Sequence, residues 1–431
     1  MLYWKRKGTE AFACLFVFLL LLLLCFLTCL GVTDMAAALV SAGVIGTGSG
    51  LVLLVLWRMA DGIQAAIICA GYLLRCACLW VDLYGRDVLT LMHSGGDSES
   101  FARDAAELYR GLGPEAVSTK YPYLISGIYR MTGENRFCAQ YVNIVFWVLG
   151  AGILLRICRR FQVKNSACQA IGAVWALLPT GVILSSILLR ESAEMFFGMW
   201  SFERFLIWMQ TGRWKYCLQA WICVVPAIIL HSASVALWVA YVAVMMFWDA
   251  REQRYRWQLR TGAVSVISLA GLWLVSKTPL RPLFFAYLGV EWNLYDITHK
   301  FFVQGGSDYL VSMDCQSWGQ FVPYTLLRMF YFLFSPLPPD ARGFRDLVMF
   351  AMDGLPLAAV IVWSLVQSGR KRQIRRYTYA ALAGGAAFAG IFAWGVRNAG
   401  TALRHRYLAW SIFIIALGIS CGHLDQKKER L

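Results

Sequence analysis

Apolar runs long enough to cross a membrane recur along this chain, and they constrain its fold more than any other feature. A membrane-spanning helix needs ~20 mainly apolar residues, because the hydrocarbon core of a bilayer is roughly 30 Å thick. Hydrophobic residues make up 59% of the 431 positions and charged residues only 15%, whereas roughly 25% of residues are charged in a soluble domain. Runs near the required length occupy residues 10–33, 35–57, 63–83, 137–155, 167–188, 193–209, 261–275, 347–367, 379–396 and 407–422. The sequence therefore predicts an all-α polytopic membrane protein with about 11–13 membrane segments, some of them broken or re-entrant.

Basic residues between the apolar runs indicate the orientation. Cytoplasmic loops of membrane proteins are enriched in Lys and Arg. Basic clusters occur at residues 5–7, 156–164, 213–215, 251–260, 370–376 and 427–430. One topology puts all of them in the cytoplasm, with a cytoplasmic N-terminus and the plasma membrane as the location. The net charge of +15 is explained by these short loops, so nucleic acid is not predicted as a partner.

The apolar sequence between residues 214 and 248 predicts a helical hairpin. It is about one and a half spans long, and it has basic clusters at both ends. A single crossing would put one of these clusters outside, whereas two short helices that turn near residues 226–234 keep both inside. Broken membrane helices line enclosed or watery cavities. His231 lies at this turn and becomes a candidate for substrate binding.

The topology divides the chain into five segments. They are an N-terminal three-helix segment (1–83), an external loop with an amphipathic helix (84–136), a membrane helix core (137–275), an external loop with a re-entrant element (276–346) and C-terminal membrane helices with a cytoplasmic tail (347–431). The re-entrant element is the short apolar run that ends in prolines at residues 324–339. No soluble catalytic domain is predicted, so any chemistry uses residues at the membrane face.

A charged segment in the first external loop contains the candidate catalytic residues. Gly95 and Gly96 allow a tight backbone conformation that brings the Asp97 carboxylate near a ligand. The apolar residues that follow recur at helical spacing, at Phe101, Ala105, Leu108 and Leu112. This periodicity predicts an amphipathic helix on the membrane surface. Two interpretations stay open: Asp97 or Ser98 caps this helix, or Asp97 is catalytic, with Glu99 as the reserve candidate.

Basic residues on the predicted external side form a second set of candidates. Guanidinium groups suit an anion such as a lipid phosphate, because they bind its oxygens in pairs. Residues 397–406 are basic and have no acidic neighbour in sequence. The candidates for substrate or lipid-phosphate binding, apart from His231, are Lys120, Tyr121, Arg190, Glu191, Arg328, Arg404 and Arg406. Headgroup anchoring and local pairing of Arg190 with Glu191 are the structural alternatives.

Five stretches of the sequence together resemble a known family. They are "GGDSESFARDAAELYRGLG", "YPYLISGIYRMTGENRF", "LLPTGVILSSILLRESAEMFF", "FYFLFSPLPP" and "GTALRHRYL". In this order they resemble the membrane-embedded glycosyltransferase C superfamily, and most closely its polyprenyl-phosphate-sugar-dependent, protein-mannosyltransferase-like members.

The resemblance implies a function and roles for individual residues. The implied function is inverting transfer of a sugar from a polyprenyl-phosphate donor, within the membrane lipids, to a glycan, lipid or protein acceptor. It implies that Asp97 is the general base and that Arg190, Arg404 and Arg406 lie near the lipid phosphate. No cofactor is implied, and a divalent metal is not indicated.

Three other classes of function stay open. Bacterial polysaccharide polymerases, which join lipid-pyrophosphate-linked sugars, resemble the chain more loosely through their external arginines and the stretch "ILHSASVALW". A lipid or solute transporter would have charges in mid-membrane, for which Arg75, Glu203 and Arg204 are candidates. A structural partner in a larger assembly is the third class. The absence of Walker, Gly-x-Ser-x-Gly and His-Glu-x-x-His motifs argues against an ATP-driven pump, a serine hydrolase and a zinc protease.

Overall fold

Helices dominate the structure. The computed structural model describes residues 35–59, 61–112, 119–250, 252–257, 259–275, 277–278, 294, 298, 307–311 and 313–424. Six helices in this part of the chain are long and apolar enough to cross a membrane, and a bent pair would make a seventh. The protein is therefore an all-α polytopic membrane protein, as the apolar runs predict. The predicted span at residues 10–33 lies outside the described residues.

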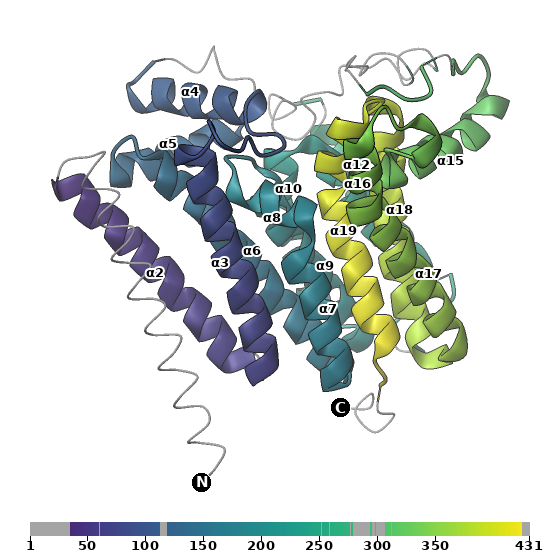
Figure 1. The fold of residues 1–431 in the computed structure, drawn as a ribbon. Helices are drawn as coiled ribbons and strands as arrows, with labels where there is room; N and C mark the ends of the chain where they lie inside the picture. The colour runs from purple at the N-terminus through teal and green to yellow at the C-terminus, as the bar shows by residue number, and fades with distance from the viewer. Residues whose placement is uncertain are drawn as a thin grey trace, which may run out of the picture. The chain divides into compact units, whose positions relative to one another are not determined.

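The chain divides into two compact units, and each is described by itself. Unit 1 comprises Met1–Arg156 and Cys168–Phe196, and unit 2 comprises Ile157–Ala167 and Phe197–Leu431. Unit 1 contains all or most of α2 (Met35–Met59), α3 (Gly62–Tyr84), α4 (Asp97–Tyr109), α5 (Tyr121–Thr132), α6 (Arg136–Arg160), α7 (Asn165–Leu177) and α8 (Pro179–Ser186). It also includes the start of α9 (Glu191–Thr211). Figure 1 shows the short helix α4 running across the direction of α3 at one end of this unit.

Helices α2, α3 and α6 approach closely around three hydroxyl groups. The hydroxyls of Ser49, Tyr72 and Tyr141 lie 2.8–3.0 Å from one another. A Cβ atom on Gly48 would lie 2.7 Å from the Tyr141 ring, so only glycine allows this approach. Small residues and interhelical hydrogen bonds are the usual means of helix association in membranes, where apolar surface alone gives little preference.

Arg75 lies in α3 and is fully buried. It donates hydrogen bonds to polar groups on both sides of the break between α7 and α8. The two helices bend by 53° where Pro179 removes a backbone donor. Arg75 Nη1 donates to the carbonyl of Ala176 (2.8 Å), and Nε donates to Ser185 Oγ (2.8 Å). Its guanidinium lies 3.5 Å from the centroid of the Trp147 ring. These contacts give Arg75 a structural role in holding the broken helix.

Replacing Arg75 with Met is expected to destabilise unit 1. The variant leaves the Ala176 carbonyl and the Ser185 hydroxyl without this donor, and each buried polar group left unpaired costs about 1–3 kcal/mol. Thermal unfolding in detergent measures the effect, with Arg130→Met, on an exposed position of α5, as the control. Equal unfolding temperatures for Arg75→Met and the wild-type protein would contradict this role.

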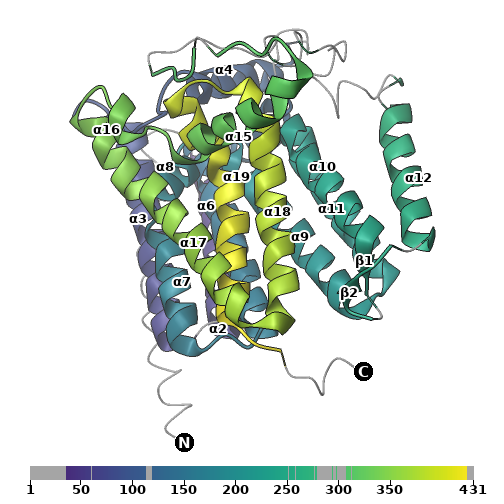
Figure 2. The ribbon, with the colours of Figure 1, turned by 90° about the vertical axis from the view of Figure 1, so that its right-hand side faces the viewer.

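Among the described residues, unit 2 contains the remaining helices and a short β-ladder. The elements are α10 (Trp214–Leu230), η2 (Ser232–Ser234), α11 (Val235–Phe247), β1 (Trp248–Asp249), β2 (Arg254–Tyr255), α12 (Leu259–Val275), α15 (Trp318–Phe334), η3 (Pro338–Asp340), α16 (Phe344–Met349), η4 (Phe350–Gly354), α17 (Leu355–Arg370), α18 (Arg372–Gly395) and α19 (Ala399–Cys421). The two strands pair antiparallel. Figure 2 shows α19, which is buried along most of its length, between α17 and α18.

The helical hairpin predicted between residues 214 and 248 is confirmed. Helices α10 and α11 are joined by His231 and the short helix η2. Their indoles stack, with the ring centroids of Trp221 and Trp238 5.7 Å apart. The turn therefore lies where the basic clusters at both ends of this apolar stretch predict it.

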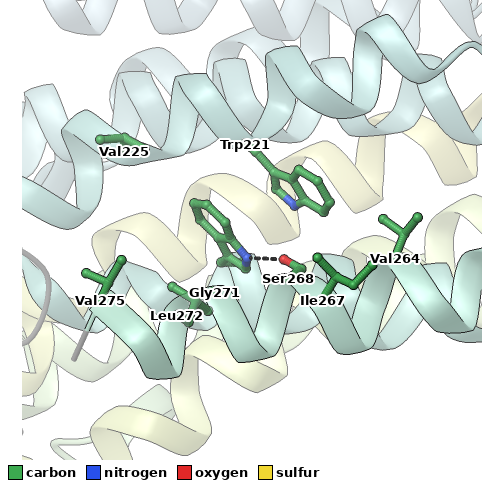
Figure 3. A pocket seen from close by; sticks show the side chains of 9 residues that line it. Trp221, Val225, Val264, Ile267, Ser268, Gly271, Leu272 and Val275 are labelled. Atoms are coloured by element: carbon green, nitrogen blue, oxygen red, sulfur yellow. Dashed lines mark hydrogen bonds between the residues drawn. The ribbon is translucent and has the colours of Figure 1, made fainter. Parts of the chain in front are cut away.

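An apolar cavity of about 370 Å³ lies between α10, α11 and α12 (Figure 3). Its lining residues are Trp221, Val225, Trp238, Val264, Ile267, Ser268, Gly271, Leu272 and Val275. The Trp238 indole donates to the Ser268 hydroxyl (2.9 Å). This lining contains no acidic or basic side chain, so the cavity does not provide the groups that acid–base or phosphate chemistry requires.

Some predicted helix boundaries and spans differ from the structure. Helix α18 begins at Arg372 rather than at residue 379, and α19 begins at Ala399 rather than at residue 407. Asn398 caps α19 by accepting a hydrogen bond from the Thr401 backbone nitrogen (3.1 Å). The predicted external segment 397–406 is therefore largely helical. Predicted spans in α9, α10, α11 and α12 are helical, but α9 carries several charges and the other three are short.

Candidate functional site

Helix α4 begins at Asp97, directly after a turn with positive φ angles. These angles are 64° at His93, 123° at Gly95 and 44° at Gly96. At the two glycines, a positive φ angle brings no steric cost from a side chain. Gly96 is the N-cap, and no side-chain hydrogen bond caps the helix. The prediction that Asp97 or Ser98 caps α4 is therefore wrong. Asp97 is instead the first helical residue, exposed, in the turn where the helix dipole favours negative charge.

The buried carboxylate of Asp82, in the last turn of α3, holds one side of this turn. It is fully buried and accepts hydrogen bonds from Ser94 Oγ and from Gln140 Nε2 (2.6 Å). Arg86 Nη2 also donates to it at 3.3 Å. The contact with Ser94 ties the chain shortly before Asp97 to α3 and α6.

Glu99 holds the other side of the turn. Its carboxylate accepts hydrogen bonds from Arg86 Nη1 (2.6 Å), Arg136 Nη1 (2.7 Å) and Arg136 Nη2 (2.8 Å). Arg136 also donates to Ser98 Oγ at 3.1 Å. The bonds from Arg136, together with those from Arg86, outweigh burial and lower the pKa of Glu99 to about 2. A base with so low a pKa is poorly matched to proton transfer near neutral pH, so these contacts favour a structural role for Glu99.

Acidification is expected to weaken this side of the turn. Because the pKa of Glu99 falls from 4.5 to about 2 on folding, its ion pairs stabilise the protein fully above pH 4.5 and lose their contribution as the pH falls toward 2. The unfolding temperatures of the wild-type protein and Glu99→Gln should therefore differ most above pH 4.5 and converge on acidification. A difference that stays constant over this range would contradict the ion pairing. Glu134→Gln, which removes an exposed pair with Arg110, is the control.

Phe101 connects α4 to Arg190. Phe101 is buried and lies one turn after Asp97, so the two side chains share a face of α4. The Arg190 guanidinium, also buried, lies 6.0 Å from the centroid of the Phe101 ring. The same ring packs edge-on against Tyr121 at 5.4 Å. Phe101 thus lies between the turn that begins at the exposed Asp97 and the buried cation of Arg190.

Tyr121 and Asn143 hold the chain just before Arg190. The Tyr121 hydroxyl donates to Asn143 Oδ1 (3.1 Å), and Asn143 Nδ2 donates to the carbonyls of Ile187 and Leu189 (both 2.9 Å). Tyr121 is 1% exposed. Its contacts favour a role in supporting the Arg190 segment over direct binding of substrate.

The other two candidates in unit 1 differ in exposure. Lys120 is exposed, and its ammonium lies 5.4 Å from the centroid of the Tyr123 ring. Glu191 is buried at the start of α9, and so is Glu194 one turn later. Both glutamates therefore lie close to Arg190 in the chain. Of the two cations, Lys120 is exposed and Arg190 is buried.

In unit 2, Arg406 forms a buried ion pair with Asp353 of η4. Both side chains are 0% exposed. Arg406 Nη1 also donates to the carbonyl of Ser335 at 2.7 Å. Arg406 has no acidic neighbour in sequence, but folding brings Asp353 to it from a distant segment. Because the guanidinium of Arg406 contacts groups of the protein itself, the structure does not favour the predicted role of Arg406 at a lipid phosphate.

Arg328 of α15 is also fully buried. Its Nη2 donates to the carbonyl of Met313 (2.7 Å), and its guanidinium lies 4.6 Å from the centroid of the Trp394 ring. Its Nε and Nη1 atoms have no hydrogen-bond partner among the described residues. Since a buried charged donor without an acceptor is costly, this arginine is suited to an anionic ligand.

His231 lies beside a second histidine in unit 2. Its ring centroid is 5.0 Å from that of His405 in α19, and both rings pack against Phe392. The His231 Nδ1 atom accepts a hydrogen bond from the Ala233 backbone nitrogen at 3.3 Å. Arg404 precedes His405 in α19 and is buried. The structure thus brings two of the predicted residues, His231 and Arg404, to the same part of unit 2.

Four residues that were not among the predicted candidates hold charged side chains or the turn in place. They are Asp82, Arg86, Arg136 and Asp353. Asp82 and Asp353 each lie in or at the end of a predicted span, where a carboxylate is costly unless it is paired. That signal identifies them as residues with a buried partner, but it does not identify the partner.

No metal-binding cluster of three or more His, Cys, Asp or Glu side chains occurs among the described residues. Comparison with known proteins finds no family model, no curated protein and no solved structure that matches the chain.

Proposed function

We propose that the protein is a membrane glycosyltransferase. It moves a sugar from a polyprenyl-phosphate donor to a glycan, lipid or protein acceptor on the outer face of the plasma membrane, with its N-terminus in the cytoplasm. The observation that carries the proposal is that Phe101, one turn after the exposed Asp97 in α4, has its ring 6.0 Å from the buried guanidinium of Arg190. The resemblance of the sequence motifs to the glycosyltransferase C superfamily supports the same assignment.

The chemistry needs a base and a cation. Asp97 takes the proton of the acceptor hydroxyl as the hydroxyl oxygen attacks the anomeric carbon of the donor sugar. The bond between the anomeric carbon and the phosphate oxygen breaks, and polyprenyl phosphate leaves with the electron pair. Arg190 stabilises the negative charge on this phosphate. Attack from the side opposite the phosphate inverts the configuration of the sugar.

Release of polyprenyl phosphate tests the proposal. The purified protein is placed in lipid vesicles with a panel of polyprenyl-phosphate sugars and candidate acceptors. The expected result is release of polyprenyl phosphate together with transfer of the sugar to one acceptor. No release with any member of the panel would overturn the proposal, and movement of an intact donor across the vesicle membrane would indicate a transporter instead.

Arg328 favours a second candidate function, polymerisation of lipid-pyrophosphate-linked sugars. Its Nε and Nη1 atoms are buried without a hydrogen-bond partner in the described part of unit 2, and a pyrophosphate offers several acceptor oxygens to such donors. The same vesicles, supplied with lipid-pyrophosphate-linked sugars, separate the two functions. Growth of a glycan chain from this donor, but not from the monophosphate donor, would favour the polymerase.

A further inference from the structure

We propose that Asp82 and Ser94 are positioning residues that fix the turn before Asp97 for sugar transfer. This inference rests on the proposed function. It explains how the exposed carboxylate of Asp97, which follows two glycines, stays in one position. Neither residue is argued to touch the substrate. They act through the backbone of the turn.

The turn is attached to the helices on both sides of Asp97. On one side, Ser94 Oγ donates to the buried carboxylate of Asp82. On the other side, Arg136 holds Ser98 (3.1 Å) and the neighbouring glutamate. Only Gly95, Gly96 and Asp97 lie between the two points of attachment. The contacts of Ser94 and Ser98 therefore restrict where the backbone of Asp97 can lie.

Asp82 is suited to anchor the turn because its own position is determined by long helices. It lies in the last turn of α3, and Gln140 of α6 donates to it at 2.6 Å. A buried carboxylate at the end of a membrane helix is costly unless donors surround it. Ser94 is one of those donors, and Arg86 is another. The cost of burying Asp82 is thus offset by contacts that also order the turn.

Two adjacent glycines make this anchor necessary. Gly95 and Gly96 have positive φ, and no atom lies within 4 Å of where a Cβ would be at either residue. A Gly–Gly segment loses much conformational freedom on ordering, so without the Ser94 contact it would sample other conformations. A general base must lie within hydrogen-bonding distance of the proton that it takes, and a 1 Å misplacement costs about 100-fold in rate.

The experiment replaces Ser94 and measures kinetics, local exchange and stability together. Ser94→Ala removes the hydroxyl that donates to Asp82, and Ser94→Thr retains it. Ser100→Ala is the matched control, because Ser100 lies in α4, after the turn that Ser94 anchors. Asp82→Asn is the second variant at the anchor. The readouts are kcat and KM for a polyprenyl-phosphate sugar, hydrogen exchange of residues 91–100, and the unfolding temperature.

The anchor predicts a particular combination of results. Ser94→Ala should lower kcat by roughly 10–100-fold with little change in KM and speed hydrogen exchange at residues 91–100. It should lower the unfolding temperature only modestly, because Asp82 keeps its donors Gln140 and Arg86. Asp82→Asn should shift kcat and exchange in the same direction. Ser94→Thr and Ser100→Ala should resemble the wild-type protein.

Each part of the inference can fail separately. Wild-type kcat and exchange in Ser94→Ala would overturn the anchor, and so would a loss confined to KM or to the unfolding temperature. If the wild-type protein transfers no sugar, the proposed function fails. Hydrogen exchange at residues 91–100 then still decides whether Ser94 and Asp82 order the turn.

Discussion

The Asp97→Asn variant is expected to transfer sugar about 10²–10⁴-fold more slowly than the wild-type protein, because general-base catalysis contributes that much. An asparagine amide has nearly the shape of the carboxylate but cannot take a proton from the acceptor hydroxyl. Asp97 is exposed and makes no capping hydrogen bond, so folding should be little affected. The initial rate of polyprenyl-phosphate release at saturating donor measures the effect.

A second acid of the same helix provides the control for Asp97. Glu107 lies near the other end of α4 and is partly exposed, so Glu107→Gln makes the same charge change without affecting the turn. This variant should retain the wild-type rate. Full activity of Asp97→Asn, or an equal loss in both variants, would contradict the role of Asp97 as base. Binding of the donor lipid should be retained in both.

The Asp353→Asn variant is expected to lower the free energy of unfolding of unit 2 by about 3–5 kcal/mol, the usual cost of removing one partner from a buried ion pair. Asp353 and Arg406 are both 0% exposed, so the variant leaves the arginine charge in an apolar interior without its counter-ion. Chemical or thermal unfolding in detergent micelles measures the loss.

A double variant separates this structural role from phosphate binding by Arg406. Replacing both partners with apolar residues of similar volume, as in Arg406→Met with Asp353→Leu, should recover most of the lost stability, because no buried charge then lacks a partner. An arginine that bound a lipid phosphate would give another result. Asp353→Asn would then leave the stability nearly unchanged and strengthen binding of the anionic lipid.

The positions of the long helices could be predicted because span length and hydropathy are local properties of the chain. Helices α2, α3 and α6 occupy the stretches in which the sequence predicts them, and so does the α10–α11 hairpin. The start of α19 could not be predicted in this way. Its first turns contain Arg404 and Arg406, and charged residues at the end of an apolar run predict an external loop. The ion pair with Asp353 allows Arg406 to be buried within the helix instead.

The polar segment around Asp97 could be located from sequence, but the roles of its charges could not. Spacing does not distinguish an N-cap from the first helical residue, and the backbone conformation at Gly96 decides that point. The partners of Glu99 are Arg86 and Arg136, which are 13 and 37 residues away in the chain. No local pattern connects these residues, so Glu99 and Asp97 appear equivalent as candidate acids in sequence.

The sequence by itself determined that this chain forms membrane-spanning helices, interrupted by a polar segment that contains a short amphipathic helix. Apolar length, helical periodicity and a Gly–Gly turn are sufficient for that, because each acts over one segment at a time. Only the tertiary structure decided which charges the protein neutralises internally. Asp82, Glu99 and Arg406 each have partners from other segments, and Asp97 is exposed at the start of α4. The physical reason is that the cost of burying a charge depends on groups that folding brings to it from distant parts of the chain.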